Sequence, residues 1–166
     1  MIDAQTMDTP AGPLTLLARD GVLVAAGFTG DPHVLFDRLS PGLRTEGLEL
    51  ADDLGELTRA TRAYFAGDLT ALDTVPLDQP GTATRKALHK ALREVAAGTT
   101  VSYGELAERA GLPRTAARAA GSACSQNLIA PFVPCHRVLP STGGAGSYLY
   151  GTPVKEWLLA HESGRA

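Results

Sequence analysis

Apolar and polar positions near the start of the chain follow the period of β-strands. Three short β-prone runs open the sequence, at residues 2–7, 13–18 and 22–28. Asp20-Gly21, between the second and third runs, is a signal for a tight hairpin. Residues 31–39 and 50–65 instead carry apolar residues at helical spacing, and Gly67 is suited to end the second helix. The pattern predicts a small antiparallel sheet with helices.

The middle of the chain marks a change of organisation. Residues 68–81 include Pro76 and Pro80 and lack a helical period, so they predict an extended connection. We therefore expect two domains, an N-terminal α/β domain of residues 1–80 and a C-terminal domain of residues 81–166.

The second half of the chain is mostly helical in pattern. Three helices are expected there, over residues 82–97, 103–110 and 116–125. Thr82 or Thr84 can cap the first, Ser102 and Glu105 form a capping box for the second, and Thr115 can cap the third. The last two helices, joined by a glycine-containing turn, have the helix-turn-helix pattern, which on its own is a weak indicator of DNA binding.

Composition and charge are those of a globular protein with two different halves. Hydrophobic residues make up 44% of the 166 residues, no apolar run is long enough to span a membrane, and the N-terminus lacks the basic start of a signal peptide. Residues 1–83 hold five basic and thirteen acidic residues, a net charge of −8, whereas residues 84–166 hold ten basic and five acidic residues, a net charge of +5. The basic half is compatible with a local phosphate-binding surface.

The strongest chemical signal is the run Phe-Val-Pro-Cys-His-Arg-Val at residues 132–138. Pro134 restricts the backbone before Cys135, which we expect at the end of a buried strand, in a loop. The thiolate is the reactive form of cysteine, and the adjacent His136 can take its proton at neutral pH. The pattern predicts a nucleophile. The other cysteine, Cys124, comes with no framework of spaced partners, so a reducing cytosol is the expected compartment.

The cysteines and histidines do not have the spacing of a metal site. The N-terminal half contains no cysteine and only one histidine, His33. Cys124, Cys135 and His136 fit no common zinc-finger spacing. We therefore expect no metal and no cofactor.

Several short motifs in one order carry a resemblance to a known family. They are Val101-Ser102-Tyr103, Ala117-Arg118-Ala119, Asn127, Pro134-Cys135-His136-Arg137-Val138, Gly146-Ser147-Tyr148 and the run from Lys155 to Glu162. Together they resemble the O6-alkylguanine-DNA alkyltransferases, the methylated-DNA–protein-cysteine methyltransferases. The resemblance implies an α/β (α+β) fold, with a ribonuclease H-like N-terminal domain and a mostly helical C-terminal domain containing a winged-helix-like helix-turn-helix.

The resemblance also implies a role for each residue of the reaction. Cys135 attacks the alkyl carbon on guanine O6 and keeps the alkyl group irreversibly, so that each molecule acts once. His136 removes the thiol proton through a water molecule, and Glu162 orients His136. Tyr103 gives a proton to the purine ring. Asn127, just past the second helix of the motif, is expected to be a turn-former whose amide ties that helix to the strand carrying Cys135.

The same resemblance implies double-stranded DNA containing alkylated guanine as the partner, with O4-alkylthymine left open as a second substrate. The damaged nucleotide must be flipped out of the duplex to reach Cys135. Arg118 then fills the gap in the base stack from the minor groove. Candidates for phosphate contact are Thr84, Arg85, Arg114 and Ser141.

The pocket around the damaged base is expected to include Val138, Tyr148, Leu149 and Tyr150. Because Tyr150 would narrow this pocket, we expect poor reaction with benzyl-sized groups on O6. The protein is expected to be a monomer in the bacterial cytosol.

Other interpretations of the same residues remain open. A cysteine hydrolase with a Cys-His-Glu triad uses the same side chains, and a helix-turn-helix protein that binds DNA without repairing it needs none of them. Taken singly, Glu162 is also readable as a surface charge, Tyr103 as a core residue and Arg118 as a solvated charge.

Overall fold

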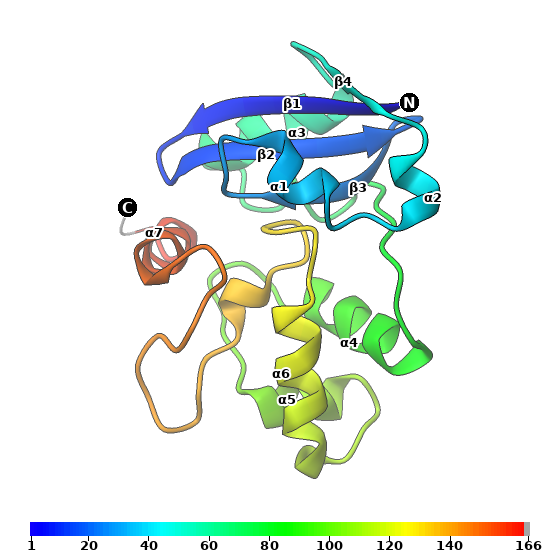
Figure 1. The fold of residues 1–166 in the computed structure, drawn as a ribbon. Helices are drawn as coiled ribbons and strands as arrows, with labels where there is room; N and C mark the ends of the chain where they lie inside the picture. The colour runs from blue at the N-terminus through cyan, green and yellow to red at the C-terminus, as the bar shows by residue number, and fades with distance from the viewer. Residues whose placement is uncertain (165–166) are drawn as a thin grey trace. The chain divides into compact units, whose positions relative to one another are not determined.

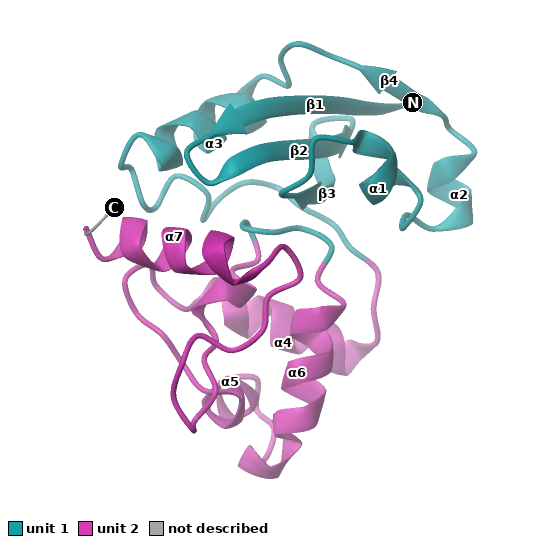
Figure 2. Ribbon diagram, turned by 60° about the vertical axis from the view of Figure 1, so that its left-hand side comes forward, with its two compact units in different colours: residues 1–79, 128–132 teal, residues 80–127, 133–166 magenta. Residues whose placement is uncertain are grey.

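The computed structural model describes residues 1–164, and these residues form two compact units (Figure 1; Figure 2). The N-terminal unit comprises residues 1–79 and 128–132, and the C-terminal unit comprises residues 80–127 and the described residues from 133 onward. The short segment 128–132 thus belongs with the first unit, although it lies far beyond the predicted boundary at residue 80. The mixed α/β fold class agrees with the prediction.

The N-terminal unit is built on a four-stranded sheet of order β3-β2-β1-β4. Its strands are β1 (Ile2–Thr9), β2 (Gly12–Arg19), β3 (Val22–Gly27) and β4 (Leu48–Leu50). The first three strands are antiparallel, as predicted, and Asp20 and Gly21 have positive φ values of 53° and 79°, as a type I′ hairpin requires.

The prediction of a purely antiparallel sheet was wrong, because β4 pairs in parallel with β1. This strand has only three residues, too few for a period to be recognised, and its Leu50 was assigned to the following helix. The helix α3 (Glu56–Phe65) begins later, after Gly55, whose φ of 67° interrupts a helical path.

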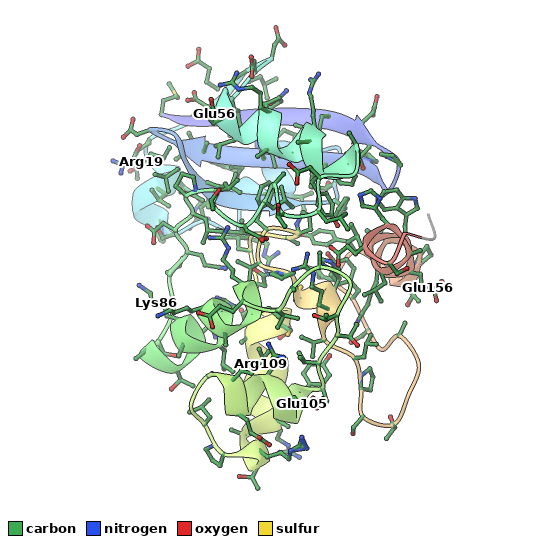
Figure 3. The ribbon with its side chains drawn as sticks, turned by 180° about the vertical axis from the view of Figure 1, so that it is seen from behind. Arg19, Glu56, Lys86, Glu105, Arg109 and Glu156 are labelled. Atoms are coloured by element: carbon green, nitrogen blue, oxygen red, sulfur yellow. The ribbon has the colours of Figure 1, made fainter. Side chains whose placement is uncertain are left out.

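Helices cover both faces of this sheet. Figures 1 and 3 show α1 (Pro32–Phe36) and α3 on opposite sides of the strands, and the short α2 (Pro41–Arg44) follows α1. Five consecutive residues of β2, from Leu14 to Ala18, are buried, as expected for a strand covered on both faces. The side chains of Thr58 on α3 and Gln5 on β1 are joined by a hydrogen bond.

The C-terminal unit holds the helix-turn-helix. Its elements are α4 (Ala83–Arg93), α5 (Tyr103–Arg109), a 3-10 turn (Arg114–Ala116), α6 (Ala117–Ser125), a second 3-10 turn (Cys135–Arg137) and α7 (Thr152–Glu162). The predicted capping box is confirmed, since Ser102 and Glu105 each accept a backbone N–H from the other. Thr82 caps α4 by accepting the N–H of Arg85 at 3.1 Å.

Two helix ends differ from the predictions. Thr115 is no helix cap: it lies inside the 3-10 turn that follows Pro113, and α6 begins without a side-chain cap. α4 ends at Arg93, four residues before the predicted end, where Glu94 and Val95 donate to carbonyls only three residues back. A helix closed by such tightened turns does not continue.

The predicted strand leading to Cys135 was also wrong. Pro131 and Pro134 lack the N–H groups that a strand would donate, and Cys135 instead begins the 3-10 turn of residues 135–137, which we call the acceptor turn. The turn is held by Val101, whose N–H donates to Arg137 at 3.0 Å and whose carbonyl accepts from Leu139 at 2.8 Å. No helix of the described residues has the length and apolar character to cross a membrane.

Candidate active site

The thiol of Cys135 is buried at the start of the acceptor turn, with 9% of the residue exposed. Asn127, just past the end of α6, donates its side-chain N–H groups to the Val133 carbonyl at 2.7 Å and to Cys135 Sγ at 3.4 Å. Burial raises the pKa of the Cys135 thiol, while the Asn127 hydrogen bond and the charge of Lys155 oppose that rise. The resting group is therefore a protonated thiol that needs a base to become a nucleophile.

The next residue in the sequence, His136, is the candidate base. The His136 ring is completely buried, and its Nε2 lies 2.8 Å from Glu162 Oε2. Because an ionised carboxylate only accepts hydrogen bonds, Nε2 carries the proton and donates, and the lone pair of the neutral ring lies on Nδ1. That Nδ1 atom is buried and has no hydrogen-bond partner within residues 1–164. Burial lowers the pKa of His136, so the ring is neutral at pH 7 and able to accept a proton.

Glu162, in the last turn of α7, is held by two basic side chains. Arg137 donates to both of its carboxylate oxygens at 2.9 Å and to the Val95 carbonyl at 2.7 Å. Burial alone would raise the pKa of Glu162, but the hydrogen bonds from Arg137 and His136 outweigh it and hold that pKa well below its usual range. Glu162 is thus a fixed carboxylate that orients His136.

Lys155 contributes a buried positive charge. Only 1% of the residue is exposed, and its Nζ donates to the carbonyls of Val138 at 2.9 Å and Ser147 at 3.3 Å. These carbonyls lie directly after the acceptor turn and in the loop of residues 139–151, which we call the substrate loop. Lys155 therefore fastens the two segments together and favours the thiolate of Cys135 electrostatically.

Tyr103 is the first residue of α5 and faces the neighbouring helix α6. A Cβ atom added at Gly121 would lie 3.9 Å from the Tyr103 ring, an ordinary van der Waals distance, so α6 packs directly against this ring. Burial raises the pKa of the Tyr103 hydroxyl, and the thiols of Cys124 and Cys135 raise it further. The Tyr103 hydroxyl is therefore protonated at neutral pH and can donate a proton, and it interacts electrostatically with Cys135.

The predicted DNA-binding residues lie on four separate segments of the C-terminal unit. Arg118 is exposed on α6, Thr84 is exposed and Arg85 half-buried on the first turn of α4, and Ser141 is exposed in the substrate loop. Arg114, in the 3-10 turn before α6, forms an exposed ion pair with Glu108 at 2.6 Å. A phosphate contact by Arg114 would therefore compete with Glu108.

The predicted pocket residues differ in exposure. Val138 is fully buried behind the acceptor turn, whereas Leu149 is 60% exposed. Tyr148 lies edge-on to His136 with a centroid distance of 6.5 Å, and Tyr150 packs edge-on to Tyr148 at 5.7 Å. An aromatic row thus runs from the base His136 into the substrate loop.

Sequence reasoning missed the contributions of Arg137 and Lys155. Both belong to the motifs that carried the resemblance, but a basic residue next to a cysteine or on an amphipathic helix is usually exposed. The available signal was position: Arg137 precedes the apolar pair Val138-Leu139, and Lys155 shares a helix face with Leu158 and Leu159. Among the described residues, no group of three histidine, cysteine, aspartate or glutamate side chains is arranged to hold a metal ion.

The fold and the site together define a protein with a buried, base-assisted cysteine beside a helix-turn-helix. Models of the "6-O-methylguanine DNA methyltransferase" family match both parts of the chain: the "ribonuclease-like domain" at residues 3–79 and the "DNA binding domain" at residues 83–164. The chain belongs to this family.

Individual relatives agree over nearly the whole chain. The methylated-DNA–protein-cysteine methyltransferase of Shigella flexneri is 39% identical over 157 residues, covering 93% of this chain and 91% of the relative. The crystal structure of Mycobacterium tuberculosis O6-methylguanine methyltransferase superposes with a TM-score of 0.81 at 35% identity, covering 100% of this chain and 95% of the other. A structure of the M. tuberculosis protein in complex with DNA gives a TM-score of 0.82 at 35% identity, covering 99% and 94%.

Proposed function

We propose that the protein repairs DNA by moving the alkyl group of O6-alkylguanine onto Cys135. The observation that carries the proposal is the buried chain from Cys135 through His136 to Glu162, in which the one ring nitrogen free to accept a proton belongs to the residue next to the thiol. Membership of the family, together with relatives named for this transfer, supports the same assignment.

The reaction is a displacement at carbon. The thiol proton of Cys135 passes through water to His136 Nδ1, and the resulting thiolate forms a bond to the alkyl carbon as the carbon–O6 bond breaks. Negative charge develops on the departing guanine, and the Tyr103 hydroxyl supplies a proton to the purine ring. The charge on His136 is stabilised by Glu162, which remains ionised throughout.

The product explains why each molecule acts once. A thioether offers no good leaving group, so the alkyl group stays on Cys135 and the nucleophile is consumed. A cysteine hydrolase with the same three side chains would instead release its product by hydrolysis of an acyl intermediate and turn over repeatedly.

DNA is the partner of the C-terminal domain, for which we propose residues 81–166, with residues 1–80 in support. A base inside a duplex is out of reach of a buried thiol, so the damaged nucleotide is flipped out. The exposed Arg118 on a helix of small residues is suited to enter the minor groove and fill the gap. The phosphates are contacted by Thr84, Arg85, Arg114 and Ser141. Arg114 exchanges its ion pair with Glu108 for one with a DNA phosphate.

The chemistry also favours a compartment. Both cysteines are free thiols, and the reaction requires Cys135 to be reduced, so we place the protein in the bacterial cytosol. We also propose that the protein acts as a monomer.

The proposal is tested by the intact mass of the protein after incubation with duplex DNA that contains O6-methylguanine. We expect one added methyl group per molecule, located on the peptide carrying Cys135, with no further conversion when DNA is in excess. Cys135→Ala is the control and should gain no methyl group. Repeated turnover would indicate a hydrolase, and DNA binding without an adduct would indicate a non-repairing binding protein.

The aromatic row of the substrate loop leads to a prediction about substrate size. Since Tyr150 extends the row that starts at His136, the wild-type protein should react poorly with O6-benzylguanine, and Tyr150→Gly should react at least about tenfold faster by relieving the steric clash. Covalent labelling followed by mass spectrometry measures this. Thr142→Ala, at an exposed position of the same loop to which no contact with the base is assigned, is the matched control and should leave labelling unchanged. Rapid labelling of the wild-type protein would contradict the prediction.

A further inference from the structure

His89 is a buried polar residue that the reaction does not use. It lies on α4, is 7% exposed, and its Nε2 is 2.8 Å from the carbonyl oxygen of Ala123 on α6. A carbonyl only accepts, so Nε2 carries the proton and donates. Burial lowers the pKa of His89, and the nearby charge of Arg85 lowers it further, against the effect of the hydrogen bond. The ring is neutral at pH 7.

The acceptor, Ala123, lies in the last turn of α6. In a continuing helix its carbonyl would accept the N–H of the residue four positions later, which is Asn127. The N–H of Asn127 instead donates to the Cys124 carbonyl at 3.2 Å, because the chain is leaving the helix. His89 therefore supplies a donor to a buried carbonyl at the helix end, where unsatisfied carbonyls are costly.

The position of this helix end matters for the nucleophile. Asn127 follows Ala123 by one turn and contacts both the Val133 carbonyl and Cys135 Sγ. A hydrogen bond of 3.4 Å to sulfur is sensitive to small shifts of the donor. A displacement of the last turn of α6 would therefore change the contact that favours the Cys135 thiolate.

We propose that His89 is a positioning residue for alkyl transfer: by donating to Ala123 it fixes the end of α6, and thereby Asn127, relative to Cys135. The test of this inference by the rate of methyl transfer rests on the proposed function. The arrangement also links α4, whose first turn carries the candidate phosphate contact Arg85, to the reacting thiol through two buried hydrogen bonds, one from His89 to Ala123 and one from Asn127 to Cys135.

Two substitutions separate the hydrogen bond from the volume of the side chain. In His89→Gln, the amide nitrogen lies the same number of bonds from Cβ as Nε2 and can still donate. In His89→Leu, the site stays apolar and filled but has no donor. We expect His89→Leu to transfer methyl from duplex O6-methylguanine about tenfold more slowly, corresponding to the loss of one buried hydrogen bond, and His89→Gln to remain within about threefold of wild type.

A second measurement distinguishes positioning from general destabilisation. The rate at which iodoacetamide alkylates Cys135 is followed against pH by mass spectrometry of the Cys135 peptide, at a temperature where all variants are folded by circular dichroism. We expect the profile of His89→Leu to shift to higher pH, because a displaced Asn127 no longer favours the thiolate, and that of His89→Gln to match wild type.

The two measurements distinguish failure of the positioning role of His89 from failure of the proposed function. If wild type gains no methyl group from DNA, the function is wrong, while the iodoacetamide profiles still test the positioning role. If wild type reacts and His89→Leu matches it in both rate and profile, the inference is overturned. A lower melting temperature for His89→Leu with an unshifted profile would likewise reduce His89 to a structural residue.

Discussion

Glu162→Gln is expected to slow alkyl transfer by about 10² to 10⁴, the range found when the orienting carboxylate of a buried histidine is neutralised. The substitution keeps the shape of the side chain but introduces an amide N–H₂ that can face His136. If it does, Nε2 becomes the acceptor and the ring proton moves to Nδ1, which then cannot take the proton of Cys135. The lower rate would result from the wrong tautomer of His136, so the affinity for DNA should be unchanged.

Single-turnover methyl transfer measures this effect, with binding of the same duplex measured by fluorescence anisotropy. Glu156→Gln is the matched control because Glu156 is an exposed glutamate on the same helix (Figure 3). It should react like wild type. If Glu162→Gln transferred methyl at the wild-type rate, the carboxylate would have no part in activating the thiol.

The same substitution has a pH-dependent effect on stability. The folded-state pKa of Glu162 lies below its value in the unfolded chain, about 4.3, so the carboxylate stabilises the fold fully above that pH and less as the pH falls below it. Removing it also leaves Arg137 buried without its partner, at a cost of about 3–5 kcal/mol. In urea unfolding, the difference between wild type and Glu162→Gln should be largest near pH 7 and shrink below about pH 4.

Elements set by neighbouring residues could be predicted from the sequence. The hairpin at Asp20-Gly21 and the capping box of Ser102 and Glu105 each follow from contacts within a few positions, and both have the expected geometry. β4 could not be predicted, because three residues carry no period and its pairing with β1 joins positions more than forty residues apart. The segment before Cys135 was mistaken for a strand because apolar character was given more weight than the two prolines.

The candidate site likewise has residues whose roles the sequence could predict and residues whose roles it could not. Cys135 and His136 are adjacent in sequence, so chemistry alone indicated a nucleophile and its base. Glu162 lies 26 positions after His136, and only the resemblance to a family brought the two together before the structure did. The role of Lys155 depends on two carbonyls from separate segments, a contact that no local pattern indicates.

Arg118→Ala is expected to slow repair of duplex DNA by about a hundredfold while changing the reaction with free O6-methylguanine base by less than about threefold. Flipping a nucleotide costs a few kcal/mol of lost stacking and pairing, and the exposed arginine on α6 offsets part of that cost by occupying the gap. The free base needs no flipping, so its reaction reports only on Cys135 and its neighbours.

The structure of the substrate provides a second comparison for Arg118. A damaged base in a single strand has no partner to leave, so the deficit of Arg118→Ala should be smaller on a single-stranded oligonucleotide than on the duplex of the same sequence. Arg109→Ala is the matched control, since Arg109 is an exposed arginine at the end of the adjacent helix α5 (Figure 3). Arg109→Ala should weaken DNA binding only by the small, salt-dependent contribution of one surface charge. Equal losses on duplex, single strand and free base would mean that Arg118 supports the fold of the site, whereas a loss confined to the duplex assigns it to extrusion of the base.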